Sequence, residues 1–247
     1  MEHLIRVTVY GLISGIIGTG LGGIIAFFIG NASNRILSFI IEFSAGIMTS
    51  VVCFELIPEA FDLGGVYPVF IGLVSGVAAI ILIEDFIKKS DLMAGKYKNS
   101  SLLKAGMLMA IGIALHNLPE GFAVGSGFEA STRLGFTITG VIVIHDIPEG
   151  IAMAVPMRAG GVSKLKTFVY TLLSGVPMGI GAFIGAALGN ISSHMIAACL
   201  SFAGGAMLYI VLGEMIPESK RIYLGRLSSV GNIIGIICGI IISKYNS

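Results

Sequence analysis

The chain has 247 residues, of which 55% are hydrophobic and only 12% are charged. An average soluble domain carries about 25% charged residues. Together with a mean hydropathy of +0.95, this composition excludes a water-soluble globular protein. It predicts a membrane protein whose partner is the lipid bilayer, with no nucleic acid. The three cysteines lie in apolar runs without paired spacing, so neither a disulfide framework nor a thiolate metal site is predicted.

Eight apolar runs follow one another along the chain, and about 20 apolar residues are enough to cross the hydrocarbon core. The predicted fold class is therefore an all-α integral membrane protein, formed by a single transmembrane domain over residues 1–247. The eight spans are expected near residues 4–29, 36–57, 66–87, 103–126, 134–157, 167–189, 194–216 and 225–243. The longest connection, residues 88–102, is expected to be a cytoplasmic loop. The first span is too long for a signal peptide and has no small-residue cleavage site after it.

Lys and Arg are distributed unevenly between the two sides of such a bundle. The connections 1–2, 3–4, 5–6 and 7–8 share one side, and the remaining connections and the two ends share the other. The first side carries twelve of the 15 basic residues: Arg35, Lys88, Lys89, Lys96, Lys98, Lys104, Arg158, Lys164, Lys166, Lys220, Arg221 and Arg226. Because short basic connections stay in the cytoplasm, both termini are predicted to lie outside, in a multi-pass protein of the cell membrane.

The first and last three spans resemble each other. The run FSAGIM at Phe43 followed by ELIPE at Glu55 recurs as FAGGAM at Phe202 followed by EMIPE at Glu214, at a constant offset of 159. Since span 2 runs outward and span 7 inward, spans 1–3 and 6–8 form an inverted repeat around a central pair, spans 4 and 5. Inverted repeats are typical of secondary transporters, whose sites lie at mid-membrane between the halves.

The central pair carries two related motifs, HNLPE at His116 and HDIPE at His145. Residues four apart share one face of a helix, so each histidine projects with its glutamate, Glu120 or Glu149. Asn117 and Asp146 take the position after each histidine, and each lies three residues before its glutamate. Two antiparallel helices with this pattern are expected to form one cation site, or two sites that share both glutamates.

Charge favours a bound cation over a purely structural, kinked pair of helices. Each acid at mid-membrane costs about 2.5–3.5 kcal/mol on insertion scales, and neither helix has a Lys or Arg in its central part. Protons or a cation must therefore neutralise Glu120, Asp146 and Glu149. Charge alone leaves open whether one or two ions bind. Imidazole and carboxylate without thiolate suit zinc, iron(II), manganese, cobalt, nickel or cadmium rather than copper(I).

The prolines and the repeat extend this site along the membrane. Pro119 and Pro148 remove a helical hydrogen bond beside each histidine and are expected to kink both helices. In span 2, Met48 is central and Glu55 lies about 10 Å further along the same stripe, near the outer mouth. The counterpart of Glu55 is Glu214, near the cytoplasmic mouth. We expect these two glutamates to flank the transport pathway, although either can also be an interfacial acid that reaches water.

With its double H-[ND]-x-P-E-G motif, its eight spans and its variable loop between spans 3 and 4, the chain resembles the ZIP (Zrt/Irt-like) family of divalent metal transporters. The resemblance covers essentially the whole chain and is to the short prokaryotic members. It implies uptake of zinc or a related ion, by an elevator-like movement of spans 1, 4, 5 and 6 against spans 2, 3, 7 and 8. A homodimer is compatible with the family. The implied first metal site consists of His116, Glu120, His145 and Glu149 with Met48 nearby, and the second of Asn117, Asp146 and the two shared glutamates.

The chain departs from the family pattern in span 6. Some members have a glutamate there that completes the second site, whereas this chain reads Ser-Gly-Val-Pro-Met from Ser174 to Met178. The second site is therefore either weaker or absent. His145 also stands where some members have glutamine, which bears on ion preference.

Two other functions compete with uptake. An intramembrane zinc hydrolase needs an open metal position and a general base, but the usual His-Glu-x-x-His pattern is missing. An exporter of the same ions is compatible with the near-symmetric geometry, so the direction of transport rests on the resemblance. No enzymatic activity and no cofactor are expected, since the metal ion is the substrate.

Overall fold

The computed structural model describes residues 1–29, 33–89 and 101–246, and its regular structure is entirely helical. Six helices are uninterrupted: α1 (Glu2–Ile29), α4 (Val66–Lys89), α5 (Ser101–Ala130), α6 (Thr132–Ala159), α7 (Lys164–Gly189) and α10 (Arg226–Asn246). Two further rods are composite, each made of a long helix, a π-helical turn and a short helix. These are α2 (Asn34–Val51), η1 (Val52–Leu56) and α3 (Ile57–Gly64), and α8 (Ser193–Ile210), η2 (Val211–Met215) and α9 (Ile216–Ile222). The predicted all-α fold with eight membrane helices is confirmed.

Seven of these rods are long and apolar enough to cross a membrane, and the eighth is α5, which carries the first of the two motifs. Apolar side chains cover much of the outer surface, while the interior holds ionisable groups in addition to an apolar core. Large side chains such as Phe70 and Leu173 are exposed, whereas Glu120, His145 and Asp146 are completely buried. Such a surface is stable only against lipid. The predicted loop 88–102 lies largely outside the described residues.

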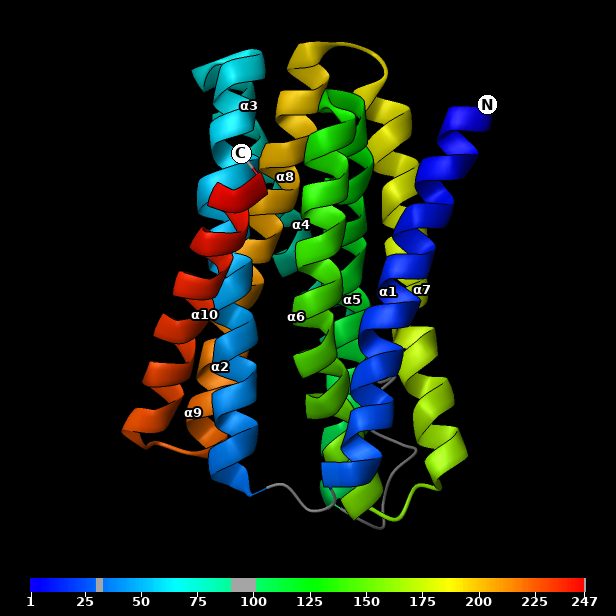
Figure 1. The fold of residues 1–247 in the computed structure, drawn as a ribbon, viewed down its shortest axis with the longest axis vertical. Coiled ribbons are helices and arrows are strands. Elements are labelled where there is room, and N and C mark those ends of the chain that lie inside the picture. The colour runs from blue at the N-terminus through cyan, green and yellow to red at the C-terminus, as the bar shows by residue number, and fades with distance from the viewer. Residues whose placement is uncertain (30–32, 90–100, 247) are drawn as a thin grey trace.

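The inverted repeat is visible in matching helix ends. Ser33 and Ser192 cap α2 and α8, each accepting a hydrogen bond from the backbone N–H three residues on. The turns η1 and η2 follow at the same offset, and the two composite rods point in opposite directions (Figure 1). The predicted relation between spans 1–3 and 6–8 is therefore confirmed.

The composite rods are longer than expected. Spans 2 and 7 were predicted to end at residues 57 and 216, but helices α3 and α9 continue them beyond the π turns. Each turn is closed by a backbone bond from residue i to residue i−5, such as Ile57 N–H to the Val52 carbonyl. Pro58 and Pro217 follow directly and occupy the first turn of α3 and α9, where the N–H that proline lacks needs no intrahelical partner. The chain therefore continues as a helix past each proline.

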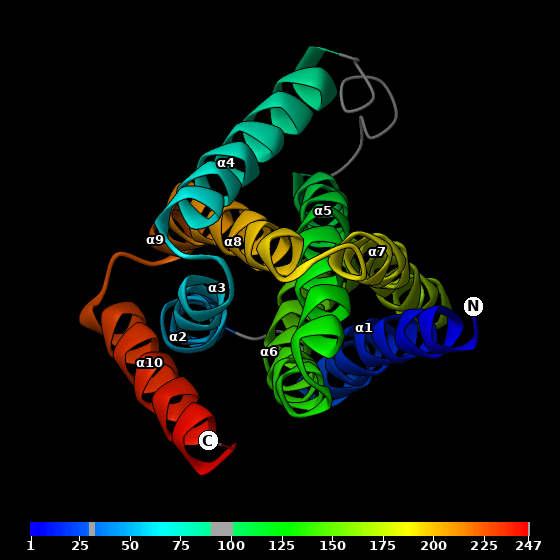
Figure 2. The same cartoon turned by 90° about the horizontal axis from the view of Figure 1, so that it is seen from above.

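Helix contacts divide the bundle into two groups. In one group α1, α5, α6 and α7 pack together, and in the other α2 packs on α10 and α4 on α8. Seen from above, the two groups lie side by side (Figure 2). They meet where α2 faces α6 and where α5 faces α8. The motif-bearing helices α5 and α6 therefore lie at the boundary between the groups.

Glycines bring helix backbones together within each group. A Cβ added to Gly15 would lie 2.5 Å from the carbonyl oxygen of Gly175, and one added to Gly46 would lie 2.2 Å from that of Asn232. Every described glycine at which an added Cβ would come within 3.4 Å of another helix meets a helix of its own group. Between the groups, by contrast, side chains meet, as in the pair Phe122 and Phe202, whose ring centroids are 5.2 Å apart.

Candidate metal centre

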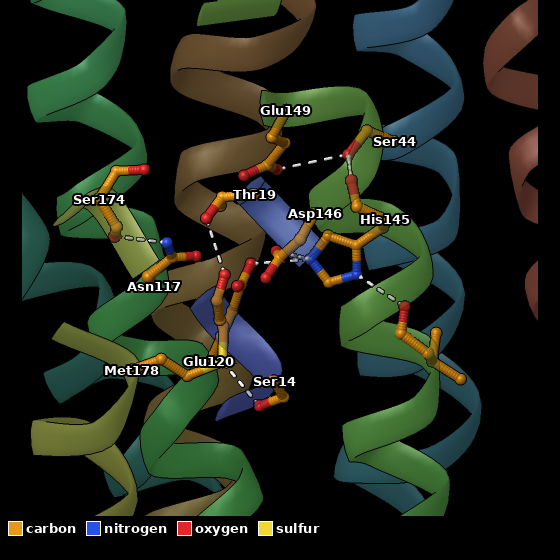
Figure 3. Close-up of polar contacts among 12 residues, drawn as sticks. Ser14, Thr19, Ser44, Asn117, Glu120, His145, Asp146, Glu149, Ser174 and Met178 are labelled. Carbon is orange, nitrogen blue, oxygen red and sulfur yellow. Dashed lines mark hydrogen bonds and ion pairs between the residues drawn. The ribbon is translucent and has the colours of Figure 1, made fainter. Parts of the chain in front are cut away.

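Three ligand-type side chains converge at the centre of the molecule. Glu120 of α5 and His145 and Glu149 of α6 each offer a ligand atom, and these atoms all lie within 4.8 Å of one another. All three side chains are buried. His145 and Glu149 share a face of α6 because they are four residues apart, and Glu120 faces them from the neighbouring helix (Figure 3). The prolines Pro119 and Pro148 beside them lie inside helices that continue through them.

The orientation of the His145 ring favours metal binding. Its Nδ1 lies 3.2 Å from the backbone carbonyl of Val141. A carbonyl can only accept, so Nδ1 carries the proton and Nε2 is the ring nitrogen available as a ligand. Nε2 points at carboxylates, 3.0 Å from Glu120 Oε1 and 3.5 Å from Asp146 Oδ1. Two ligand atoms bound to one tetrahedral zinc lie about 3.4 Å apart, which is close to both distances.

Several buried oxygens at this centre have no hydrogen-bond partner among the described residues. They are Asn117 Oδ1, Glu120 Oε2, Asp146 Oδ1 and Oδ2, and Glu149 Oε2. An unpaired buried polar atom costs free energy, and a carboxylate costs more than an amide. Glu120 and Glu149 also place like charges within 4.8 Å of each other, which costs further free energy. A cation that binds among these oxygens removes both costs.

Helix α7 covers the side on which the resemblance implies a second site. Asn117 donates its side-chain N–H to the Ser174 carbonyl at 2.6 Å. The amide oxygen has no hydrogen-bond partner and is the atom of Asn117 that can bind a metal ion. Met178 lies in the segment where the resemblance implies an acid in some members, and its sulfur is fully buried and accepts from Ser14 Oγ at 3.2 Å. The second group of oxygens, from Asn117 and Asp146, is thus present, with a thioether rather than a carboxylate on α7.

Helix α2 contributes a polar contact that the sequence analysis missed. Ser44 Oγ lies 3.1 Å from the His145 carbonyl and 3.3 Å from Glu149 Oε1. Met48 is four residues further along the same face of α2 and is completely buried. A signal for Ser44 was present, since the repeat places Ala203 at its equivalent position. Within the run from Phe43 to Met48, Ser44 is therefore the one hydroxyl residue, and the matching run from Phe202 to Met207 has none.

The remaining predicted residues, His116, Glu55 and Glu214, are not members of the three-ligand group. His116 Nε2 is 3.6 Å from Glu214 Oε2, in the π turn η2. His116 is buried, whereas the side chain of Glu214 is about one-third exposed. Glu55 occupies the equivalent π turn η1 and is half-buried. His116 thus connects the motif on α5 with one of the two predicted pathway glutamates.

Comparison with known proteins identifies the family. The sequence profile described as ZIP zinc transporter matches residues 83–243, which is well over half of the chain. The chain belongs to the ZIP family. It is 31% identical to the zinc transporter ZupT of Clostridium perfringens, over 96% of this chain and 94% of that protein. It is 29% identical to ZupT of Akkermansia muciniphila, over 96% of both chains, and 37% identical to the zinc transporter GufA of Myxococcus xanthus over 64% of this chain and 61% of that protein.

Membership of the ZIP family confirms the predicted resemblance and the transporter class. It also excludes the competing hydrolase, because the family consists of transporters. The buried group of Glu120, His145 and Glu149 is the metal-binding candidate of this ZIP protein. The metal is its substrate and passes through the protein.

Proposed function

We propose that this ZIP protein moves zinc, and related ions such as iron(II), manganese, cobalt and cadmium, across the cell membrane into the cytoplasm. The observation that supports this function best is the set of buried, unpartnered oxygens around the Glu120, His145 and Glu149 group. A neutral imidazole with carboxylates is a zinc-type donor set. Its ligand atoms come from α5 and α6, at the boundary between the two helix groups, where a bound ion can become accessible from either side.

Two sites are part of the proposal, with unequal donor sets. The first is formed by Glu120, His145 and Glu149, with Met48 on the facing helix and His116 one turn of α5 away. The second is formed by Asn117, Asp146 and the shared glutamates, with only the Met178 thioether from α7. A hard or borderline ion prefers oxygen to thioether. The second site is therefore expected to bind more weakly.

The orientation of the chain in the membrane is inferred from the distribution of basic residues, whereas the direction of transport is inferred from the family. Both chain ends lie toward the same end of the bundle (Figure 1), and twelve of the 15 Lys and Arg residues belong to the connections that the sequence assigns to the opposite side. Short basic connections face the cytoplasm. The termini are accordingly proposed to lie outside, with Glu55 toward the outer mouth and Glu214 toward the cytoplasmic mouth.

Alternating access is proposed to occur by sliding of the two helix groups. The close glycine contacts occur within each group and hold it as a unit. Between the groups, Ser44 contacts Glu149 and His145, and His116 contacts Glu214. These contacts involve the site and the pathway residues themselves. Movement of the α1, α5, α6 and α7 group would therefore carry the bound ion from Glu55 toward Glu214.

The test is initial zinc uptake into proteoliposomes that contain the purified protein. Glu120→Ala and His116→Ala are expected to abolish uptake while the thermal unfolding of the protein remains cooperative. His194→Ala is the matched control, because His194 is exposed at the start of α8. Undiminished zinc entry in both site variants would overturn the proposal. Efflux from preloaded vesicles of known orientation distinguishes export from uptake, and native mass spectrometry tests the proposed homodimer.

A further inference from the structure

A groove that takes no part in the metal centre lies between α6 and α10. It encloses about 540 Å³, is open on one side, and is lined by Arg133, Phe136, Gly140 and Ile144 of α6 and Ile242 of α10. Its walls belong to the two different helix groups. The groove opens on the outer surface of a membrane-spanning bundle, so its contents come from the bilayer.

The lining residues of α6 follow one stripe of the helix. Arg133, Phe136, Gly140 and Ile144 are separated by three or four residues, which is the spacing of a single helix face. From Arg133 to Ile144 the stripe extends 11 residues, or about 16 Å. Half of the hydrocarbon core of a bilayer is about 15 Å thick. The groove therefore matches the depth of one leaflet.

The chemistry of the groove changes along its length. Arg133 lies two residues after the N-cap Ser131, in the first turn of α6, and α6 begins at the end of the bundle that holds the chain termini (Figure 1). Below it the walls are apolar except for Thr137, and Phe136 and Ile144 are 53% and 43% exposed. The Phe136 ring is held by Tyr10 and Phe128, at centroid distances of 5.6 and 5.1 Å. One cationic end and a rigid apolar wall have the polarity of a phospholipid that stands upright in the membrane.

We propose that this groove binds one anionic phospholipid from the leaflet on the side of the termini. Its phosphate pairs with Arg133, and one acyl chain lies along Phe136, Gly140 and Ile144. A helix from a second copy of the chain does not fit inside. A 16 Å length of helix about 10 Å across occupies roughly 1,250 Å³, which is more than twice the groove, whereas an extended acyl chain is much thinner.

The position of the groove connects the lipid to transport. Val141 also lines the groove, and its carbonyl accepts the hydrogen bond that orients His145. Because the groove has one wall on each helix group, its shape changes whenever the groups slide. Lipid occupancy is therefore expected to alter the uptake rate. This consequence rests on the proposed function, whereas lipid binding does not.

Binding is tested by native mass spectrometry of the full chain, titrated with dioleoylphosphatidylglycerol. Gly140→Leu fills the groove without a clash, because a Cβ added at Gly140 has nothing within 4 Å. It is expected to weaken the tightest lipid adduct at least about tenfold, equivalent to displacing two methylene groups. Arg133→Gln is expected to weaken the same adduct about fivefold, and by itself decides the question if Gly140→Leu does not fold.

Two matched controls separate this groove from general lipid contact. Ala78→Leu adds bulk to an exposed position of α4, and Arg6→Gln removes an exposed cation from α1 at the same end of the molecule. Both are expected to leave the adduct within about twofold of the wild type. Equal lipid binding by the wild type and both groove variants overturns the proposal. So does a change in the dimer fraction of Gly140→Leu with unchanged lipid binding, which would make the groove a contact between copies.

The lipid titration does not depend on transport, so it tests the binding site even if the protein shows no zinc uptake. A groove variant that loses the lipid adduct and also changes its uptake rate with phosphatidylglycerol content supports both steps. A variant that loses the adduct but keeps the wild-type uptake rate supports the binding site and refutes its effect on sliding.

Discussion

Glu120→Gln is predicted to have opposite effects on stability in the absence and presence of zinc. The substitution keeps the shape of the side chain and removes its charge. Glu120 is completely buried, one of its oxygens has no hydrogen-bond partner, and the other lies 3.0 Å from His145. The variant therefore carries one fewer of the three central acids. Without metal, losing a mid-membrane charge is worth up to about 2.5–3.5 kcal/mol, so the variant should unfold at a higher temperature than the wild type.

With zinc the order should reverse. A ligand at 100 times its Kd stabilises a protein by about 2.7 kcal/mol, which corresponds to roughly 5–11 °C in Tm for a chain of this size. The wild type should gain this amount, whereas Glu120→Gln loses an anionic ligand and should gain much less. The comparison is made by thermal unfolding in detergent, once with a chelator and once with zinc.

Glu129→Gln is the matched control on the same helix. Glu129 lies near the end of α5, where it pairs with His3 at 2.8 Å, and it is not part of the central group. Its zinc-induced shift in Tm should equal that of the wild type. If Glu120→Gln were less stable than the wild type without metal, or gained the full shift with zinc, the assignment of the buried acids to a cation site would be wrong.

Three further substitutions test the surroundings of the site. Ser44→Ala removes the hydroxyl beside Glu149 and should lower zinc affinity about tenfold, as is usual when a group that orients a metal ligand is lost; competition with a fluorescent chelator measures this. His116→Ala and Glu214→Gln, combined in a double-mutant cycle of unfolding free energies measured by denaturation, should show a coupling of about 0.5–3 kcal/mol if the 3.6 Å pair functions as a unit. Gly18→Ala places a Cβ 2.4 Å from Asp146 Cβ and should destabilise the fold by about 1–3 kcal/mol, measured by denaturation.

Each of these predictions has an outcome that contradicts it. Ser75→Ala removes only a bond within α4, so an equal loss of affinity in this control would show that the Ser44 effect is not local. Additive unfolding free energies in the double-mutant cycle would show that His116 and Glu214 do not interact. A stable Gly18→Ala variant with normal zinc affinity would mean that α1 can move away from Asp146 without a loss of folding free energy.

The sequence was sufficient for features that depend on local pattern. Apolar runs of membrane length predicted the eight helices, since lipid requires every backbone polar group to be satisfied within a helix. The constant offset between the segments at Phe43 and Phe202 predicted the inverted repeat. The spacing of His145 and Glu149 placed two ligands on one face of a helix. These inferences need only helix geometry and the identity of the solvent.

Only the tertiary structure decided which side chains meet. His145 and Glu120 lie on different helices, and their approach to 3.0 Å depends on how α6 packs against α5. The repeated glutamates gave no sign that Glu214 would lie beside His116, because the contact depends on a π turn that shifts the register of one helix. Ser44 likewise joins the site only through the contact of α2 with α6. Contacts between helices are set by packing over the whole bundle. The motif therefore predicted the candidate ligand residues, but not which residues of other helices contact them.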